Sequence, residues 1–299
     1  MRVGDFRSDE ARAHFLEVYR DAMAQLPPAS ETRDVPTRFG TVRVYRFDGA
    51  TDATPVMLLP GRNASTPMWR TNIPALLTHR PVLGIDLLGE AGMSVQRKPI
   101  TGPDDEAQWL DDTVTALNLD RVHLMGVSIG GWSAINYAVR RPGRAASLVL
   151  LDPVFTFAPV AVKAMLVSPV LVLPGVPDRL RRRVLSWLSG GAEVDDSLPE
   201  AALISAGSTD YVLRKAIPKM ITDEQLRALD IPVLALLGGR SVMHDAGRAA
   251  VRARNLLPHA QVELWSDASH AINGEYAAEI ADRASAFWDE VDRRTGAHL

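Results

Sequence analysis

A serine flanked by glycines is the clearest chemical feature of the sequence. The segment LMGVSIGGWSA contains the pattern G-x-S-x-G, with Ser128 between Gly126 and Gly130. It follows an apolar, strand-like run and opens a helix-like one, the context that a sharp strand-to-helix turn requires. Two residues before and after such a serine the backbone passes so close that a side chain would clash, so glycine is needed. The pattern predicts a strained serine nucleophile, with the backbone N–H of Ile129 aimed at negative charge developing on a substrate.

Serine is a weak nucleophile alone, so a base is needed, and three histidines are candidates for that role. His270 lies in the segment WSDASHAI, after the last predicted strand and before the final helix. His244 stands near a helix start beside Asp245, and His123 lies inside a strand, where packing in the core is the simpler interpretation. We therefore predict that His270 is the base, with His244 as its rival.

The composition excludes several other classes of function. The 299 residues include 46% hydrophobic and 23% charged side chains, and the formal net charge is −3, as in an ordinary soluble globular protein. No basic stretch is interleaved with aromatic residues, so we expect no nucleic-acid partner. The absence of cysteine excludes disulfides, cysteine-bound zinc and a thiol nucleophile. The histidines show no metal-ligand spacing, so neither a metal nor another cofactor is expected.

No segment of the sequence predicts a signal peptide or a membrane span. The N-terminal segment lacks an apolar core of signal-peptide type, so we expect a cytoplasmic protein. The longest apolar stretch, residues 164–176, is too short for a span and is interrupted by Pro169 and Pro174. A cover over an apolar cavity is the better interpretation of this stretch. Nothing in the sequence predicts the oligomeric state.

Apolar strands alternate with helices along most of the chain. A helix that follows Ser8 and a hairpin joined at Gly40 come first. Six buried strands follow, at residues 55–61, 81–87, 121–127, 146–152, 231–238 and 260–267. Continuous Val- and Leu-rich strands separated by helices predict an α/β fold, with a mostly parallel central sheet and helices on both faces.

One connection between strands is far longer than a crossover helix needs. Residues 153–230 are rich in Pro, Leu and Val and contain helix-like pieces without strand alternation. We therefore predict a core made of residues 1–152 and 231–299. We expect residues 153–230 to form a helical lid, or cap, inserted over the open end of the sheet.

Four segments together resemble the α/β-hydrolase superfamily, in its esterase and lipase branch. They are GVSIGG (126–131), LLPGRNAS (58–65), GIDLLGEAGMS (84–94) and WSDASHAI (265–272). The similarity covers nearly the whole chain and is greatest to compact bacterial carboxylesterases with a helical cap, in which a Met-Trp pair follows the oxyanion loop as Met68-Trp69 does here. The resemblance implies the α/β-hydrolase fold and a serine-dependent reaction without a cofactor.

The resemblance also implies where the second oxyanion donor lies. An oxyanion hole needs a backbone N–H from the loop that follows the first buried strand, and here that donor would be Arg62, acting together with Ile129. Pro60 stands where the family often has histidine, which matters little because the backbone is the donor. Asn63 is a second candidate for contacting the substrate.

The acid of a Ser-His-acid triad is missing from its usual place. In most relatives it lies about three residues after the glycine that ends the strand IPVLALLG, and counting from Gly238 gives Ser241. Asp245 is close by, but its position indicates the N-cap of a helix. Asp152 ends the strand expected beside the nucleophile strand, where some members of the superfamily carry their acid. Parallel strands are about 4.8 Å apart, so Asp152 would still reach His270. We predict Asp152, with Asp245 and an acid-free dyad as alternatives.

These residues predict a serine carboxylesterase that cleaves a small to medium apolar ester, or a related acyl bond, through an acyl-enzyme. Ser128 would attack the carbonyl, His270 would transfer the proton and Asp152 would orient His270. Ser241 keeps a second class open, a hydrolase-like protein that binds ligands or signals without catalysis. A cofactor-free lyase or acyltransferase on the same scaffold is a further alternative. The expected partner is a small-molecule ester.

Overall fold

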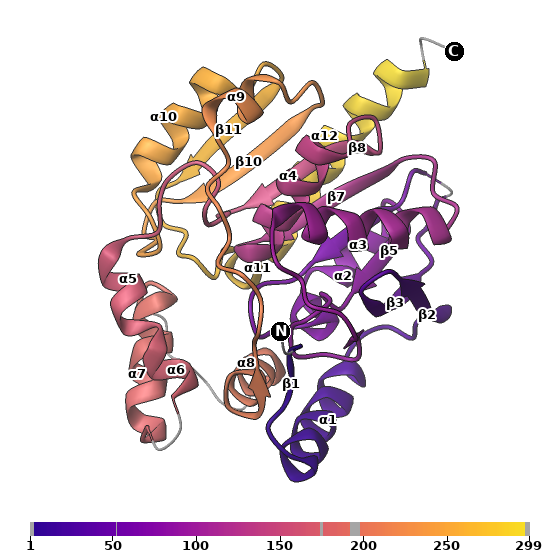
Figure 1. The fold of residues 1–299 in the computed structure, drawn as a ribbon. Helices are drawn as coiled ribbons and strands as arrows, with labels where there is room; N and C mark the ends of the chain where they lie inside the picture. The colour runs from indigo at the N-terminus through magenta and orange to yellow at the C-terminus, as the bar shows by residue number, and fades with distance from the viewer. Residues whose placement is uncertain (1–2, 52, 174–175, 192–197, 297–299) are drawn as a thin grey trace.

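One large sheet organises the chain (Figure 1). A computed structural model describes residues 3–51, 53–173, 176–191 and 198–296. Within these residues, nine strands form one sheet in the order β11-β10-β8-β7-β4-β5-β3-β2, with β6 paired to β3. The strands are β2 (Glu31–Thr37), β3 (Gly40–Phe47), β4 (Val56–Leu59), β5 (Val82–Ile85), β6 (Val95–Gln96), β7 (Val122–Val127), β8 (Ala145–Leu151), β10 (Val233–Gly238) and β11 (Ala260–Trp265). The strands from β11 to β5 run parallel, and β3 joins them antiparallel.

Burial on both faces explains why the central strands read as continuous apolar runs. Every residue of β4, β5, β7, β8 and β10 is buried. Successive side chains of a strand point to opposite faces. In β4, Met57 and Leu59 accordingly join one apolar cluster, whereas Val56 and Leu58 join the other. Strand β2 lies at an edge and is mostly exposed, which is where a sheet accommodates a proline such as Pro36.

Helices cover both faces of the sheet. One apolar cluster packs against α3, α4 and α10, and the other against α1, α2 and α12. The helices of this part are α1 (Asp9–Met23), the 3-10 helix η1 (Thr66–Trp69), α2 (Ile73–Leu77), α3 (Pro103–Ala116), α4 (Ile129–Arg140), α10 (Ala246–Leu256), α11 (Ile272–Glu275) and α12 (Ala277–Gly296). None of the helices in the described ranges is long and apolar enough to cross a membrane. The predicted fold class, a mostly parallel sheet with helices on both faces, is confirmed.

The segment between β8 and β10 is largely helical, and α5 to α8 gather at one end of the molecule in Figure 1. It contains α5 (Val162–Val167), α6 (Pro169–Val172), α7 (Asp178–Leu188), α8 (Pro199–Asp210), β9 (Tyr211–Val212) and α9 (Asp223–Arg227). Residues 174–175 and 192–197 of the predicted cap lie outside the described residues. The N–H of Ile221 donates to the carbonyl of Phe155 at 3.1 Å, so the two ends of the segment meet. The boundaries of a separate cap unit stay a prediction.

The N-terminal segment packs against α8 and β9 of this insertion. Strand β1 (Asp5–Phe6) pairs antiparallel with β9, and α1 packs against α8. The Nδ1 atom of His14 lies 2.6 Å from Oδ2 of Asp210, which adds a polar contact between the same two helices. Neither β1 nor β9 was predicted from the sequence, because their pairing joins segments far apart in the chain and leaves no local pattern.

A buried arginine ties the last helix to the sheet. The guanidinium of Arg80 is fully buried and donates to the carboxylates of Asp289 and Asp292, each at 3.1 Å, and to the carbonyl of Thr54 at 2.9 Å. It also lies 4.9 Å from the centre of the Trp288 ring. Leucine at position 80 would leave the Thr54 carbonyl and the partly exposed Asp292 carboxylate without this donor. We expect Arg80→Leu to lower the free energy of unfolding by about 2 kcal/mol, measured by urea denaturation.

The matched control is an arginine in an exposed ion pair. Arg46 lies 2.9 Å from Asp48, and the two side chains are 41% and 63% exposed. Such pairs contribute little, so Arg46→Leu should cost less than about 1 kcal/mol. Equal losses in the two variants would show that burial of the Arg80 network does not stabilise the fold.

Candidate active site

Ser128 occupies a sharp turn between β7 and α4. Its φ of 55° and ψ of −117° lie in a region that residues with a side chain rarely adopt. A Cβ atom on Gly130 would lie 2.0 Å from the carbonyl oxygen of Leu59, and one on Gly126 would lie 2.4 Å from the Gly130 backbone. Both positions therefore require glycine, and the turn presents a partly exposed Ser128 side chain above the edge of the sheet.

His270 lies directly against this serine. Its Nε2 atom is 2.9 Å from Oγ of Ser128, within hydrogen-bond distance. His270 follows β11 in a loop held by the carboxylate of Glu275, which accepts from the N–H and the Oγ of Ser269, each at 2.7 Å. The arrangement places the predicted base at the distance from the serine that proton transfer requires.

Asp152 completes a row of three hydrogen-bonded side chains. It follows β8, is fully buried, and has a left-handed φ of 42°. Its Oδ2 atom lies 2.5 Å from Nδ1 of His270. The N–H of Ser128 donates to the carbonyl of Leu151 at 3.0 Å, so the ends of β7 and β8 are joined at this point. The structure thus brings together the three residues predicted as nucleophile, base and acid.

The charge of Asp152 is set by its neighbours. Burial by itself would raise the pKa of this carboxyl, but the adjacent imidazoles of His244 and His270 outweigh burial and hold the pKa well below its ordinary range. A carboxylate that stays ionised can stabilise a histidine cation formed during proton transfer. The electrostatics of the site therefore suit the role expected of a triad acid.

The alternative acid, Asp245, points elsewhere. Its Oδ1 atom accepts from the N–H of Arg248 at 2.9 Å, which makes it the N-cap of α10, and its side chain is largely exposed. His123 is buried far from Ser128 along β7, with its ring nitrogens 2.8 Å from Oγ of Ser147 and 3.0 Å from Asp292. Burial lowers the pKa of His123, which favours the neutral imidazole, although the contact with Asp292 opposes this shift.

Ser241 and His244 both face Asp152, and the sequence did not predict either contact. Oγ of Ser241 donates to Oδ2 of Asp152 at 2.6 Å, and the N–H of Gly238 donates to Oδ1 at 3.0 Å. Nε2 of His244 lies 3.3 Å from Oδ1. The segment GGRSVMHD, with Ser241 at the usual acid position, therefore contacts Asp152, the residue at the neighbouring strand end that is predicted as the acid. The position of Ser241, three residues after Gly238, was the only signal in the sequence, because the direction of these side chains depends on the path of the loop.

The predicted oxyanion donors lie on the two backbone segments that flank Ser128. Ile129 is the first residue of α4, so its N–H has no partner inside the helix. A Cβ atom on Gly61 would lie 3.9 Å from Cβ of Ser128, so the loop that continues to Arg62 passes beside the serine. The Arg62 side chain is exposed. Asn63 has a left-handed φ of 56°, and its Nδ2 donates to Oγ of Ser208 at 2.9 Å, so its amide is engaged by α8.

A buried aspartate fixes this loop to the sheet. Asp86, after β5, accepts from the N–H and Oγ1 of Thr66 at 2.9 and 2.8 Å, from the N–H of Met93 at 2.8 Å and from the hydroxyl of Tyr19 at 2.9 Å. Burial raises the pKa of Asp86, although these donors oppose the rise. The segment GIDLLGEAGMS thus supports the loop predicted to carry an oxyanion donor, through Asp86.

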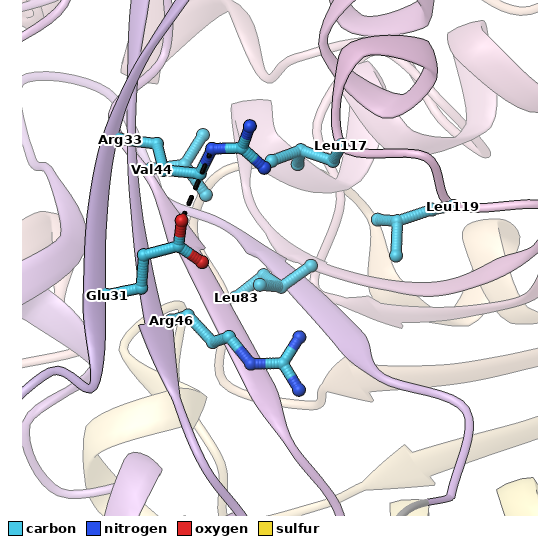
Figure 2. Close-up of a pocket in the computed structure, with 7 residues that line it drawn as sticks. All are labelled: Glu31, Arg33, Val44, Arg46, Leu83, Leu117 and Leu119. Carbon is cyan, nitrogen blue, oxygen red and sulfur yellow. Dashed lines mark ion pairs between the residues drawn. The ribbon is translucent and has the colours of Figure 1, made fainter.

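A small hollow shown in Figure 2 is separate from this site. Its lining residues are Glu31, Arg33, Val44, Arg46, Leu83, Leu117 and Leu119. Leu119 precedes β7 whereas Ser128 follows it, and a strand of this length spans about 20 Å. The ion pair of Glu31 and Arg33, at 3.4 Å, lies between partly exposed side chains. The hollow is a surface feature of the opposite end of the sheet.

Comparisons with known proteins agree with the observed fold. Residues 54–275 match the family described as alpha/beta hydrolase fold. The carboxylesterase YbfK of Bacillus subtilis (strain 168) is 26% identical over 94% of this chain and 96% of its own length. The crystal structure of that protein, carboxylesterase CesB (YbfK), has a TM-score of 0.85 over 93% of this chain and 98% of its own. The naproxen esterase (carboxylesterase NP) from Bacillus subtilis has a TM-score of 0.84 at 26% identity, over 94% of this chain and 99% of its own.

Proposed function

The chain belongs to the α/β-hydrolase fold family, and on that premise we propose that it is a serine carboxylesterase. The observation that carries the proposal is the row Asp152–His270–Ser128, with distances of 2.5 and 2.9 Å between successive side chains. The two Bacillus subtilis relatives, which match over nearly their whole length, bear the name carboxylesterase. The names and the geometry support the same activity independently.

The proposed reaction proceeds in two halves. His270 removes the proton of Ser128 as its Oγ attacks the ester carbonyl, and the N–H groups of Ile129 and Arg62 bind the oxyanion. The imidazolium, stabilised by Asp152, then gives its proton to the leaving alcohol, and the acyl-enzyme forms. Water attacks the acyl-enzyme with His270 again as base, which releases the carboxylic acid and restores the serine.

A small to medium apolar ester is the substrate class that we propose. Helix α8 lies against the oxyanion loop, since a Cβ atom on Gly207 would come within 2.4 Å of the Asn63 carbonyl oxygen. Leu203 and Ala206 of α8 share an apolar cluster with Met68, which follows that loop. These contacts support a cap at residues 153–230 whose inner side is apolar. An apolar acyl or alcohol group would gain from burial against such a wall.

Hydrolysis of p-nitrophenyl acetate and butyrate, combined with labelling by a fluorophosphonate, tests the proposal. We expect turnover of both esters and a single label, located by peptide mass spectrometry on Ser128. Absence of both turnover and label would favour a non-catalytic hydrolase-like protein. Labelling without hydrolysis in water would favour transfer to another acceptor, as in an acyltransferase.

A further inference from the structure

The loop that joins β10 to α10 encloses the carboxylate of Asp152. Three groups face it, namely the N–H of Gly238 at the end of β10, and the Ser241 hydroxyl and the His244 ring in the loop. We propose that Ser241 and His244 are positioning residues that hold Asp152 in its catalytic orientation. The inference rests on the proposed function, because it assigns these residues to the support of the triad.

The hydroxyl of Ser241 is oriented toward the carboxylate. Its oxygen accepts from the N–H of Met243 at 3.3 Å, and it lies 2.6 Å from Oδ2 of Asp152. Because a carboxylate can only accept, the hydroxyl proton of Ser241 must point to Asp152. The same Oδ2 faces Nδ1 of His270 at 2.5 Å. Ser241 therefore anchors the oxygen that orients the base.

His244 approaches the other carboxylate oxygen. Its side chain is 1% exposed, and its Nε2 lies 3.3 Å from Oδ1 of Asp152, bent away from ideal hydrogen-bond geometry. Within the described residues, neither ring nitrogen makes a hydrogen bond of ordinary geometry. A buried imidazole without another polar partner is costly unless it interacts with the carboxylate. The contact with Asp152 therefore explains why the buried ring of His244 lies at this position.

Both contacts stabilise the charged form of Asp152. A fully buried carboxylate needs donors to stay ionised, and the titratable groups that face it in the described residues are His270 and His244. Ser241 and His244 stabilise the unprotonated state of the Asp152–His270 pair, in which Asp152 is charged. Without these two side chains, the pair would therefore bind its first proton at a higher pH. The active form, with a neutral His270, would then be lost earlier on acidification.

The test compares wild type with Ser241→Ala, His244→Leu and His244→Gln on p-nitrophenyl butyrate. The Ser241 hydroxyl donates a hydrogen bond to a charged group, so Ser241→Ala should lower kcat by about 10- to 100-fold. His244→Leu removes a longer contact of poorer geometry, so it should lower kcat by about 3- to 10-fold. KM should change less than about twofold, since neither side chain is expected to touch the substrate. The acid limb of the pH profile of kcat/KM should move to higher pH by roughly half a pH unit or more. His244→Gln, whose side-chain amide can also approach Oδ1 of Asp152, should recover most of kcat.

Matched controls separate positioning from general destabilisation. His259 and Ser30 are exposed and lie outside the site, so His259→Leu and Ser30→Ala should leave kcat and the pH profile unchanged. If His244→Leu does not fold, Ser241→Ala, which removes a single oxygen atom, decides the matter. An active wild type whose Ser241→Ala variant keeps its kcat and acid limb would overturn the inference and leave the proposed function intact. An inactive, unlabelled wild type would overturn both.

Discussion

Alanine at position 128 should lower kcat for p-nitrophenyl butyrate by about 10⁶-fold, the order of magnitude seen when a serine nucleophile is removed. The Oγ of Ser128 is the atom 2.9 Å from Nε2 of His270, and it stands at a turn that keeps it accessible. Without it the base has only water to activate, although the oxyanion donors remain in place. Residual activity should therefore be close to the contribution of binding and oxyanion stabilisation alone.

Glycine at the same position supplies the control for structure. The backbone of Ser128, with φ 55° and ψ −117°, is strained for any residue that has a Cβ atom. Ser128→Gly should therefore be as inactive as Ser128→Ala but more stable than it, by about 1–3 kcal/mol. The measurement is thermal unfolding of the two variants beside their single-turnover rates. More than about one per cent of wild-type kcat in both variants would exclude Ser128 as the nucleophile.

Local patterns were sufficient to single out Ser128 and His270 as the candidate nucleophile and base, and the structure places these two side chains in contact. Ser128 is recognisable in the sequence because the turn requires glycine at positions 126 and 130, where any Cβ atom would clash with nearby backbone atoms. His270 follows the last strand in a position that topology brings to the same edge of the sheet. The predicted strands likewise agree with the structure within a few residues, since burial on both faces leaves a strong apolar signal.

Contacts that depend on the path of a loop left no comparable signal. The sequence indicated only that Ser241 could not be an acid, whereas its hydroxyl in fact donates to Asp152. The support of the His270 loop by Glu275 depends on a short helix that follows it. The pairing of β1 with β9 joins distant residues with no periodic pattern. Side-chain direction in loops is determined by tertiary packing, which a linear pattern does not contain.

Asparagine at position 152 should lower kcat by about 10⁴-fold, the loss expected when a triad acid becomes neutral. The amide could still meet His270 Nδ1, which now lies 2.5 Å from Oδ2 of Asp152, but it would not stabilise the imidazolium. Asp245→Asn is the control, because that side chain caps α10 and is largely exposed. We expect it to retain kcat within about threefold and to lose at most about 1 kcal/mol of stability. The reverse order of the two losses would assign the acid to Asp245.

Placing a carboxylate at position 241 tests the same claim, that His270 requires a negative charge beside its Nδ1 atom. Oγ of Ser241 lies 2.6 Å from the oxygen of Asp152 that faces His270, so an aspartate there would bring its carboxylate close to Nδ1. In the Asp152→Asn background, Ser241→Asp should therefore restore roughly 10- to 100-fold of the lost kcat, because negative charge returns to the imidazole. In the wild-type background the same change should be harmful, since two buried carboxylates this close cannot both stay ionised. A substitution that helps only when Asp152 is neutral would show that the requirement is one negative charge beside His270, whichever strand end supplies it.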